Sequence, residues 1–259
     1  MGHVRLGRLP ATKRWEQVVA LLSTSSSIEK VAGASAEAAE SSLEHARNDP
    51  AVQQSFWLLT QIPLAARAPD FSKSLQSLGL EVGASPSLFD IVGAFAKAVD
   101  HHSEELGGRT DLGEMAQHAA AESLAASAAA DLPTLFGSTS AEVRIAIGKL
   151  AARDHFARLA RDFFARLTQR HLDYYLSRTL SDQVGPGRRL LSADDHVAFT
   201  AVLEQHCREA SRIVQTFAGD WFSKANFERD LTPEKARKFL FVALGKIGRE
   251  LRQRRTPGD

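Results

Sequence analysis

Residues 153–184 read RDHFARLARDFFARLTQRHLDYYLSRTLSDQV, and this stretch decides the fold class. Apolar side chains recur along it at intervals of three, four and seven residues, at Phe156, Leu159, Phe163, Leu167 and Tyr174. A second apolar line lies beside the first, through Phe164, Leu172, Tyr175 and Leu180. This spacing follows the 3.6-residue period of an α-helix and not the two-residue period of a strand. We expect one long helix that packs against more than one neighbour.

Helix starts are marked on both sides of this stretch by a capping residue followed by proline. Three such pairs occur, namely Asp49-Pro50, Ser85-Pro86 and Thr232-Pro233. In each pair a side-chain oxygen can accept a hydrogen bond from a free backbone amide. Proline at the first helical position loses no hydrogen bond, because that amide has no partner inside the helix. Further helices are expected at 12–22, 27–48, 70–79, 111–132, 140–151 and 192–217.

Three segments are expected to interrupt the helices. Pro63 lies inside the apolar run that follows Asp49-Pro50, and a proline there predicts a kink or a break. GPGRR at 185–189 predicts a turn, and AGDWFSKANFERD at 218–230 is expected to be irregular. The sequence therefore predicts an all-α multi-helix bundle, arranged as one body or as two helical subdomains.

Charge divides the chain near Gly137. Residues 1–139 hold 10 Lys and Arg against 16 Asp and Glu, whereas residues 140–259 hold 22 against 15. The formal charges are −6 and +7, which the overall value of +1 conceals. We expect an acidic, Ala-rich helical subdomain at 1–139 and a basic one with long helices at 140–259. Opposite charges of this kind can steer different partners, although Arg-rich coding alone could produce the basic half.

Composition also limits the cellular compartment that we expect for the protein. Cys207 is the single cysteine, so neither an intramolecular disulfide nor a cysteine metal cluster can form. No apolar run approaches the roughly 20 residues that a transmembrane helix needs, and the N-terminal residues lack the pattern of a secretory leader. We expect a cytoplasmic protein with no membrane partner, in which Cys207 is a core residue.

Motifs for several chemistries are missing. The sequence contains no phosphate-binding GxxxxGK[ST] loop, no GxGxxG turn after a strand and no GxSxG elbow. Two histidine-bearing helices offer metal-ligand types, but they lack the paired Glu-x-x-His of di-iron bundles. Their candidate residues are His101, His102, Glu105, Glu114, His118 and Glu122. We interpret these as solvated polar faces and expect no metal, no cofactor and no small-molecule substrate.

Arg166 and His171, in RLTQRH, have the Arg-x4-His spacing of HEPN ribonucleases and so resemble the motif of that all-helical family. The resemblance implies RNA cleavage, with Arg166 holding a phosphate and His171 handling the proton of the 2′-hydroxyl. It covers these six residues and the helical class. Leu167 departs from the pattern, because the family usually has a polar residue after the arginine.

The basic half also suggests nucleic-acid binding without catalysis. The candidate phosphate-binding residues are Arg158, Arg161, Arg188, Arg189, Lys246, Arg249, Arg252 and Arg254. Such a patch suffices for contacts to a phosphate backbone, and affinity would then fall steeply with salt. The alternatives are solvated helix faces, a plain turn at Arg188-Arg189, and basic residues that complement the dipole of the last helix.

Aromatic residues mark the candidate protein interfaces. Phe56 and Trp57 lie in an apolar run, and Trp221 and Phe222 lie in the segment expected to be irregular. Aromatic residues are enriched at interfaces, although most of them lie in cores.

Three stretches resemble uncharacterised all-helical proteins encoded in bacterial defence or mobile-element operons. They are FWLLTQIPLAARAPDF (56–71), RDFFARLTQRHLDYYLSRTLSDQVG (161–185) and HCREASRIVQTFAGDWFSK (206–224). The resemblance implies a subunit of an anti-phage defence assembly. Our leading expectation is a non-catalytic helical subunit that contacts other proteins and nucleic acid. The alternative is a HEPN-like ribonuclease or toxin that uses Arg166 and His171.

Overall fold

The computed structural model describes residues 12–24, 26–39, 46, 48–134, 137–180 and 193–253, apart from the side chains of 178–180 and 193. These parts of the chain form eleven α-helices and no β-strand, which confirms the predicted all-α bundle. The helices are α1 (Lys13–Ser23), α2 (Ile28–Ala38), α4 (Pro50–Ala65), α5 (Phe71–Ser77), α6 (Leu88–Glu105), α7 (Asp111–Ala129), α8 (Ser140–Lys149), α9 (Arg153–Leu180), α10 (Ala193–Ala210), α11 (Arg212–Phe227) and α12 (Pro233–Gln253).

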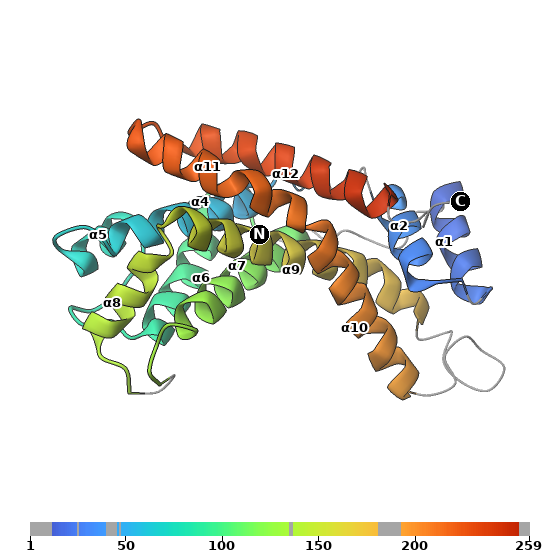
Figure 1. Ribbon diagram of the computed structural model, residues 1–259, viewed down its shortest axis with the longest axis horizontal. Coiled ribbons are helices and arrows are strands. Elements are labelled where there is room, and N and C mark those ends of the chain that lie inside the picture. The colour runs from blue at the N-terminus through green and yellow to red at the C-terminus, as the bar shows by residue number, and fades with distance from the viewer. Residues whose placement is uncertain are drawn as a thin grey trace.

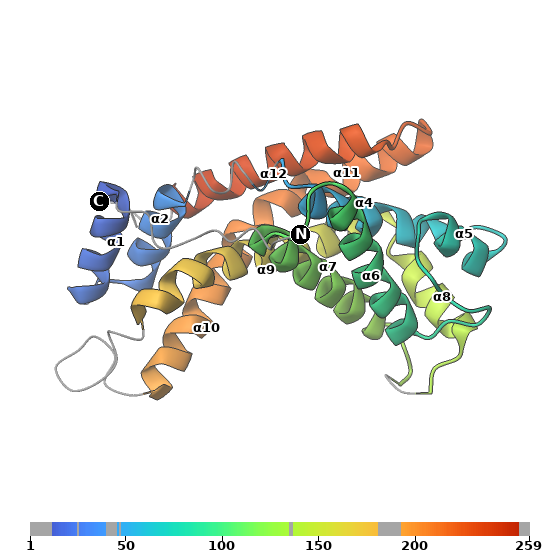
Figure 2. The same ribbon diagram turned by 180° about the vertical axis from the view of Figure 1, so that it is seen from behind.

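The helices build an arched molecule around α9 (Figure 1). Helix α9 is the longest and runs through the middle, with α4–α8 at one end and α1 and α2 at the other. Helices α11 and α12 lie side by side along the upper edge in both views (Figure 2). The long helix predicted at 153–184 is therefore confirmed as far as Leu180.

Phe56 of α4 joins both halves of the sequence in one hydrophobic core. Its ring stacks on Phe239 of α12 at a centroid distance of 5.4 Å and lies 5.7 Å from Phe163 of α9. Trp221 of α11 lies 6.1 Å from the same ring. Nearly all buried apolar residues of both halves belong to this single cluster. The charge boundary near Gly137 therefore does not coincide with a boundary between separate cores in the described residues.

Two predicted helix starts meet at one point. The side chain of Asp49 accepts hydrogen bonds from the amides of Ala51 and Val52 at 2.9 and 3.1 Å, which caps α4. Thr110 caps α7 through the amide of Gly113 at 2.8 Å, and its hydroxyl also donates to Asp49. A Cβ added at Gly113 would lie 2.6 Å from the Cβ of Ala51. Glycine therefore lets the first turns of α4 and α7 approach closely.

Other predicted boundaries need correction. The helix expected after Ser85-Pro86 begins at Leu88, because Ser87 and Asp90 form a reciprocal capping box. Pro63 does not break α4, which continues for two more residues. The helix expected over 27–48 ends at Ala38, and the single helix expected over 192–217 is interrupted at Ser211.

The prediction of irregular structure at 218–230 is wrong, because α11 extends to Phe227. Gly219, Asp220 and Asn226 are weak helix formers, but tertiary packing overrides this preference. The ring of Phe222 stacks on Phe156 of α9 at 3.8 Å. A Cβ at position 219 would lie 2.6 Å from the carbonyl oxygen of Arg153, so glycine permits this close contact with α9.

None of the described helices combines the length and the apolar character that crossing a membrane would require.

Candidate anion-binding cleft

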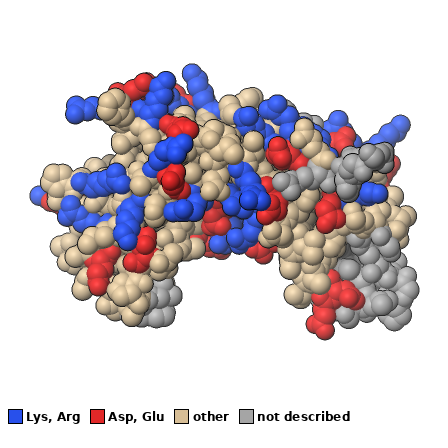
Figure 3. Space-filling view, viewed as in Figure 1, with Lys and Arg blue, Asp and Glu red and all other residues tan. Residues whose placement is uncertain are grey.

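A basic cleft of about 590 Å³ lies where α7, α9 and α10 meet. Four arginines line it, namely Arg158, Arg161, Arg166 and Arg208, together with His155. Asp131 and Asp162 are its acidic lining residues, so the lining carries a formal charge of +2 with histidine neutral. Figure 3 shows Lys and Arg side chains gathered across the middle of this face of the molecule, next to a hollow in the surface. The site is therefore a concave, net positive surface.

The helical period of α9 separates the cleft from the core. Arg158, Arg161, Asp162 and Arg166 follow each other at spacings of one, three or four residues, which places them on one face. Phe163 lies between them in sequence but is 0% exposed in the core. One helix thus supplies both a polar wall for the cleft and an aromatic layer for the core.

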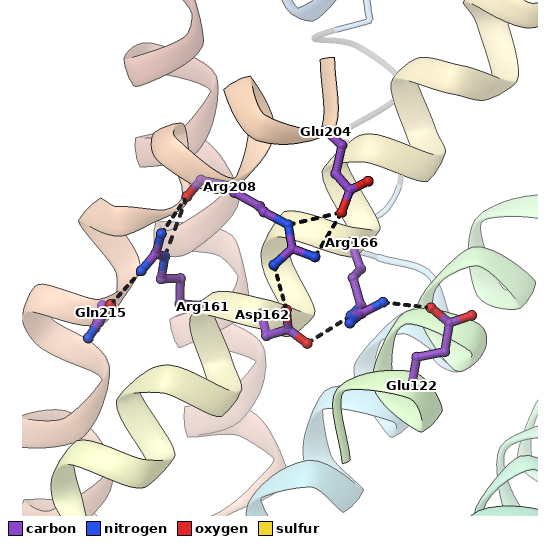
Figure 4. Close-up of polar contacts among 7 residues, drawn as sticks. All are labelled: Glu122, Arg161, Asp162, Arg166, Glu204, Arg208 and Gln215. Atoms are coloured by element: carbon purple, nitrogen blue, oxygen red, sulfur yellow. Dashed lines mark hydrogen bonds and ion pairs between the residues drawn. The ribbon is translucent and has the colours of Figure 1, made fainter. Parts of the chain in front are cut away.

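Alternating charges cross the cleft from α10 through α9 to α7 (Figure 4). Arg208 donates to Glu204 at 2.8 Å and lies 3.8 Å from Asp162. Arg166 donates to Asp162 at 2.7 Å and to Glu122 at 3.0 Å. Exposed and half-exposed pairs of this kind contribute about 0–1 kcal/mol each to stability. Their main effect is to fix the orientation of the side chains.

The carboxylates of Asp162 and Glu122 also keep the guanidinium of Arg166 protonated. Partial burial lowers the pKa of its guanidinium, but hydrogen bonds and charge attraction from Asp162 and Glu122 outweigh this and raise the pKa above its ordinary value. Arg166 is therefore cationic, and its charge is already neutralised by two neighbours.

Arg161 is held in a different way. Its guanidinium donates to the carbonyl oxygen of Arg208 through Nε and Nη2, both at 3.4 Å, and to Oε1 of Gln215 at 3.2 Å. These acceptors are neutral, so they orient the side chain without cancelling its charge (Figure 4). Within the part of the chain that the structure describes, no carboxylate pairs with Arg161 or with exposed Arg158. Among the described residues, the cleft therefore contains two arginines whose charge no ion pair offsets.

A second depression of about 400 Å³ adjoins the cleft, since Arg158 lines both. Arg153 and Asp220 form an ion pair on its wall, and this hydrogen bond raises the pKa of Arg153. From Arg153 to Arg166 the basic face of α9 extends for about 20 Å at 1.5 Å per residue. The positive surface is thus longer than a single phosphate group.

Arg166 and His171 do not converge at an open site in this structure. Five residues separate them, so they point about 140° apart around the helix axis. His171 is 0% exposed, contacts the backbone at Ala39, and lies edge-on to Tyr175 at a ring distance of 5.4 Å. Burial lowers the pKa of His171 to about 4, which keeps the ring neutral at physiological pH. The proton-transfer role that the HEPN resemblance implies would require this histidine to become accessible.

Two further titratable residues have shifted pKa values: Cys207 of α10 is fully buried, and Asp173 of α9 is partly buried. Cys207 is 0% exposed, and burial raises the pKa of its thiol, with a further rise from Asp173 and Glu204. The residue is a buried core cysteine, as expected from the sequence. Burial also raises the pKa of Asp173 to about 6, although Gln169 and Arg170 act in the opposite direction.

The histidines considered as metal ligands remain apart. His101 pairs with Glu105 of its own helix at 3.4 Å, and Glu122 is engaged by Arg166 and Arg170. Among the residues that the structure describes, no three His, Cys, Asp or Glu side chains come together as a metal site would require.

The structure brings together only some of the predicted phosphate-binding residues. Arg158 and Arg161 lie in the cleft, whereas Lys246 lies over the ring of Phe217 at 5.5 Å and Arg249 bonds to the carbonyl of Gly245, both on α12. Arg252 also belongs to α12, and Arg188, Arg189 and Arg254 fall outside the described residues. Sequence reasoning missed His155 and Arg208. The Glu204–Arg208 spacing of four residues indicated a helical ion pair but could not place it at a cleft.

The predicted interface aromatics mostly lie inside the molecule. Phe56 and Phe222 are at most 1% exposed, and Trp57 is a partly buried residue packed against the core. Trp221 is also partly buried, and it borders a groove between α11 and α12. Of the four, Trp221 is the residue that the structure places beside an open surface feature.

No protein-family model matches this chain, and neither the curated proteins nor the solved structures include a significant match.

Proposed function

We propose that this protein is a non-catalytic nucleic-acid-binding subunit that holds a phosphate backbone in the cleft between α7, α9 and α10. The observation that carries the proposal is the uncompensated charge of Arg158 and Arg161 in a concave site. An arginine offers several donors in a planar arrangement that matches phosphate oxygens, so a guanidinium without a carboxylate partner favours such a ligand.

The neighbouring network supports the same function. Arg166 and Arg208 are tied to carboxylates on three helices, so they keep the walls of the cleft in place. Arg161 is oriented by neutral acceptors and needs little reorganisation before it binds an anion. Preorganised donors lower the entropic cost of binding.

The length of the basic face favours a polymer over a small anion. Arg158 connects the cleft to the second depression, and the arginines of α9 span about 20 Å, with the ion-paired Arg153 and Arg166 at the two ends. Successive phosphates along one strand of B-DNA are about 3.4 Å apart along the helix axis, so several of them fit within this length. Chain-like polyanions therefore use more of the surface than a single phosphate would.

Fluorescence anisotropy with labelled single-stranded RNA, single-stranded DNA and duplex DNA tests this proposal. Arg158→Glu should weaken binding to the preferred probe by about tenfold, because it removes one phosphate contact and adds a repulsive charge. Lys97→Glu on α6 makes the same change of charge at an exposed position outside the cleft and should alter affinity less than about twofold.

Three outcomes would contradict the proposal. The first is an equal loss of affinity in the two variants, and the second is displacement of the probe by inorganic phosphate at an equal concentration of phosphate groups. The third is RNA cleavage that disappears in a His155→Gln variant, because it would make the cleft catalytic. Arg249→Glu serves as a further comparison, since a larger loss there would move the binding surface to α12.

A further inference from the structure

A second surface feature lies between α11 and α12, away from the arginines of the cleft. It is a groove of about 490 Å³ lined by residues of both helices. The helices are joined by the short segment 228–232 and form an antiparallel hairpin (Figures 1 and 2). The groove lies in the half of this hairpin next to the joining segment. None of the residues that line this groove lines the cleft.

The base of the groove is aromatic and aliphatic. The ring centroids of Trp221 and Phe239 lie 4.3 Å apart, and the ring centroid of Phe217 lies 5.2 Å from that of Phe239. Val242 continues the apolar surface and is 44% exposed. Phe239 is 5% exposed and anchors the groove to the core. A bulky apolar side chain could therefore enter the groove without rearranging the core below it.

The rim of the groove is basic. Lys224, Lys235 and Lys238 stand against Glu228 among its charged lining residues, which gives a formal charge of +2. Lys224 lies 3.9 Å from Glu228 and Lys235 pairs with Asp230, whereas Lys238 makes no ion pair with any described residue. The whole of α12 carries six basic and two acidic side chains. The groove therefore combines an apolar base with a positively charged border.

We infer that this groove binds an acidic amphipathic helix of a partner protein. An amphipathic helix places apolar side chains at i, i+3, i+4 and i+7 into such grooves, and acidic residues on its flanks would complement the lysines. From Phe217 to Glu228 the groove follows α11 for about 16 Å, which corresponds to about three turns of a bound helix. The basic rim thus favours an acidic helix, and the length of the groove limits the contact to about three helical turns.

The arrangement of the rings favours a peptide over nucleic acid. Trp221 and Phe239 pack against each other at 4.3 Å, so their faces are partly used in this contact and are not free platforms for stacked bases. The chain's own residues 1–11 carry Arg5 and Arg8 and no acidic residue, so their charge matches that of the rim and does not complement it. An acidic segment from another protein complements the charge of the rim and does not need free ring faces for stacking.

Three labelled synthetic peptides of about 14 residues, long enough for about four helical turns, provide the test. The first has Leu at i, i+3, i+4 and i+7 with Glu at its flanking positions, the second has Lys in place of Glu, and the third has the first composition in scrambled order. At low salt the full-length protein should bind the acidic peptide about tenfold more tightly than either of the others.

Variants separate the groove from the rest of the surface. Val242→Glu should weaken binding of the acidic peptide by about tenfold, because it places a charge in the apolar base. Ile145→Glu changes a residue on α8 that is 62% exposed and should leave binding unchanged. Lys238→Glu should reduce the preference for the acidic peptide over the lysine peptide. Thermal unfolding of each variant checks that the fold is retained.

The inference fails if the acidic and lysine peptides bind equally, or if Val242→Glu and Ile145→Glu have the same effect. It also fails if an oligonucleotide or a vesicle of anionic phospholipid displaces the acidic peptide, since the groove would then serve a different class of partner. Arg158→Glu should leave peptide binding intact. The groove and the cleft can therefore be tested separately, and the failure of one leaves the other standing.

Discussion

Helix α9 has one face that lines the cleft and one face that lies in the core, and each face contains a histidine. On the cleft face, His155 is partly exposed, and Arg158 and Arg161 carry charges that no ion pair offsets within the described chain. On the core face, His171 is 0% exposed beside Tyr175, and Phe163 lies against the ring of Phe56. The same helix thus presents one histidine to solvent and keeps another neutral in the core.

This difference shows that the surroundings of a side chain decide whether it can act as a catalytic group. A matching motif spacing in the sequence is not enough. Arg166 and His171 have the spacing of a ribonuclease motif, but one side chain reaches α7 and the other contacts the backbone at Ala39. Arg166 lies on the face of α9 that lines the cleft, whereas His171 is 0% exposed. Arg158, Arg161 and Asp162 share a face and therefore form one wall of the cleft.

The largest expected effect comes from the core face. Phe163→Ala should lower the free energy of unfolding by about 3–5 kcal/mol, because it removes a fully buried ring that packs against both Phe56 and Phe164. Urea denaturation followed by circular dichroism measures the change. Arg158→Ala on the opposite face is the matched control and should change stability by less than about 0.5 kcal/mol. Equal losses in the two variants would contradict the division of α9 into a structural and a binding face.

A smaller effect concerns the pH dependence of stability. His171 has an ordinary pKa of 6.5, and burial lowers its pKa in the folded protein to about 4. Between these values the unfolded chain binds a proton that the folded chain does not, so acid stabilises the unfolded state. Stability from this residue is fully present above pH 6.5 and is lost as the pH falls toward about 4.

His171→Gln removes this contribution. The stability difference between wild type and variant should therefore shift by about 2–3 kcal/mol in favour of the variant between about pH 7 and pH 4.5. Urea denaturation at several pH values measures it. A difference that stays constant with pH would show that His171 titrates normally and is accessible, which would restore the ribonuclease alternative.

Much of the fold could be predicted from the sequence because its signals are local. The apolar spacing at 153–180 and the caps at Asp49, Thr110 and Thr232 depend on residues within a few positions of each other. The helix over 212–227 could not be predicted in full, because Gly219 and Asn226 favour irregular structure until Phe222 packs on Phe156. That contact joins segments more than sixty residues apart in sequence.

The candidate site could be predicted only in part for the same reason. Arg158 and Arg161 stand out as basic residues on a predicted helix, but the cleft forms only when Arg208 of α10 and the end of α7 meet α9. The charge of a residue is visible in the sequence, whereas its neutralisation depends on tertiary neighbours. Glu122 neutralises Arg166 from a distance of 44 residues, and no equivalent partner reaches Arg161 in the described structure.

The salt dependence of nucleic-acid binding tests the central claim most directly. Affinity for the preferred probe should be measured across a range of salt concentrations for wild type, Arg158→Ala, Arg161→Ala and the control Lys97→Ala. If the two cleft arginines contact phosphates, each cleft variant should reduce the slope of log affinity against log salt by about 0.7–0.9, and the control should leave it unchanged. Identical slopes for all four proteins would contradict the assignment of the cleft as the phosphate-binding site.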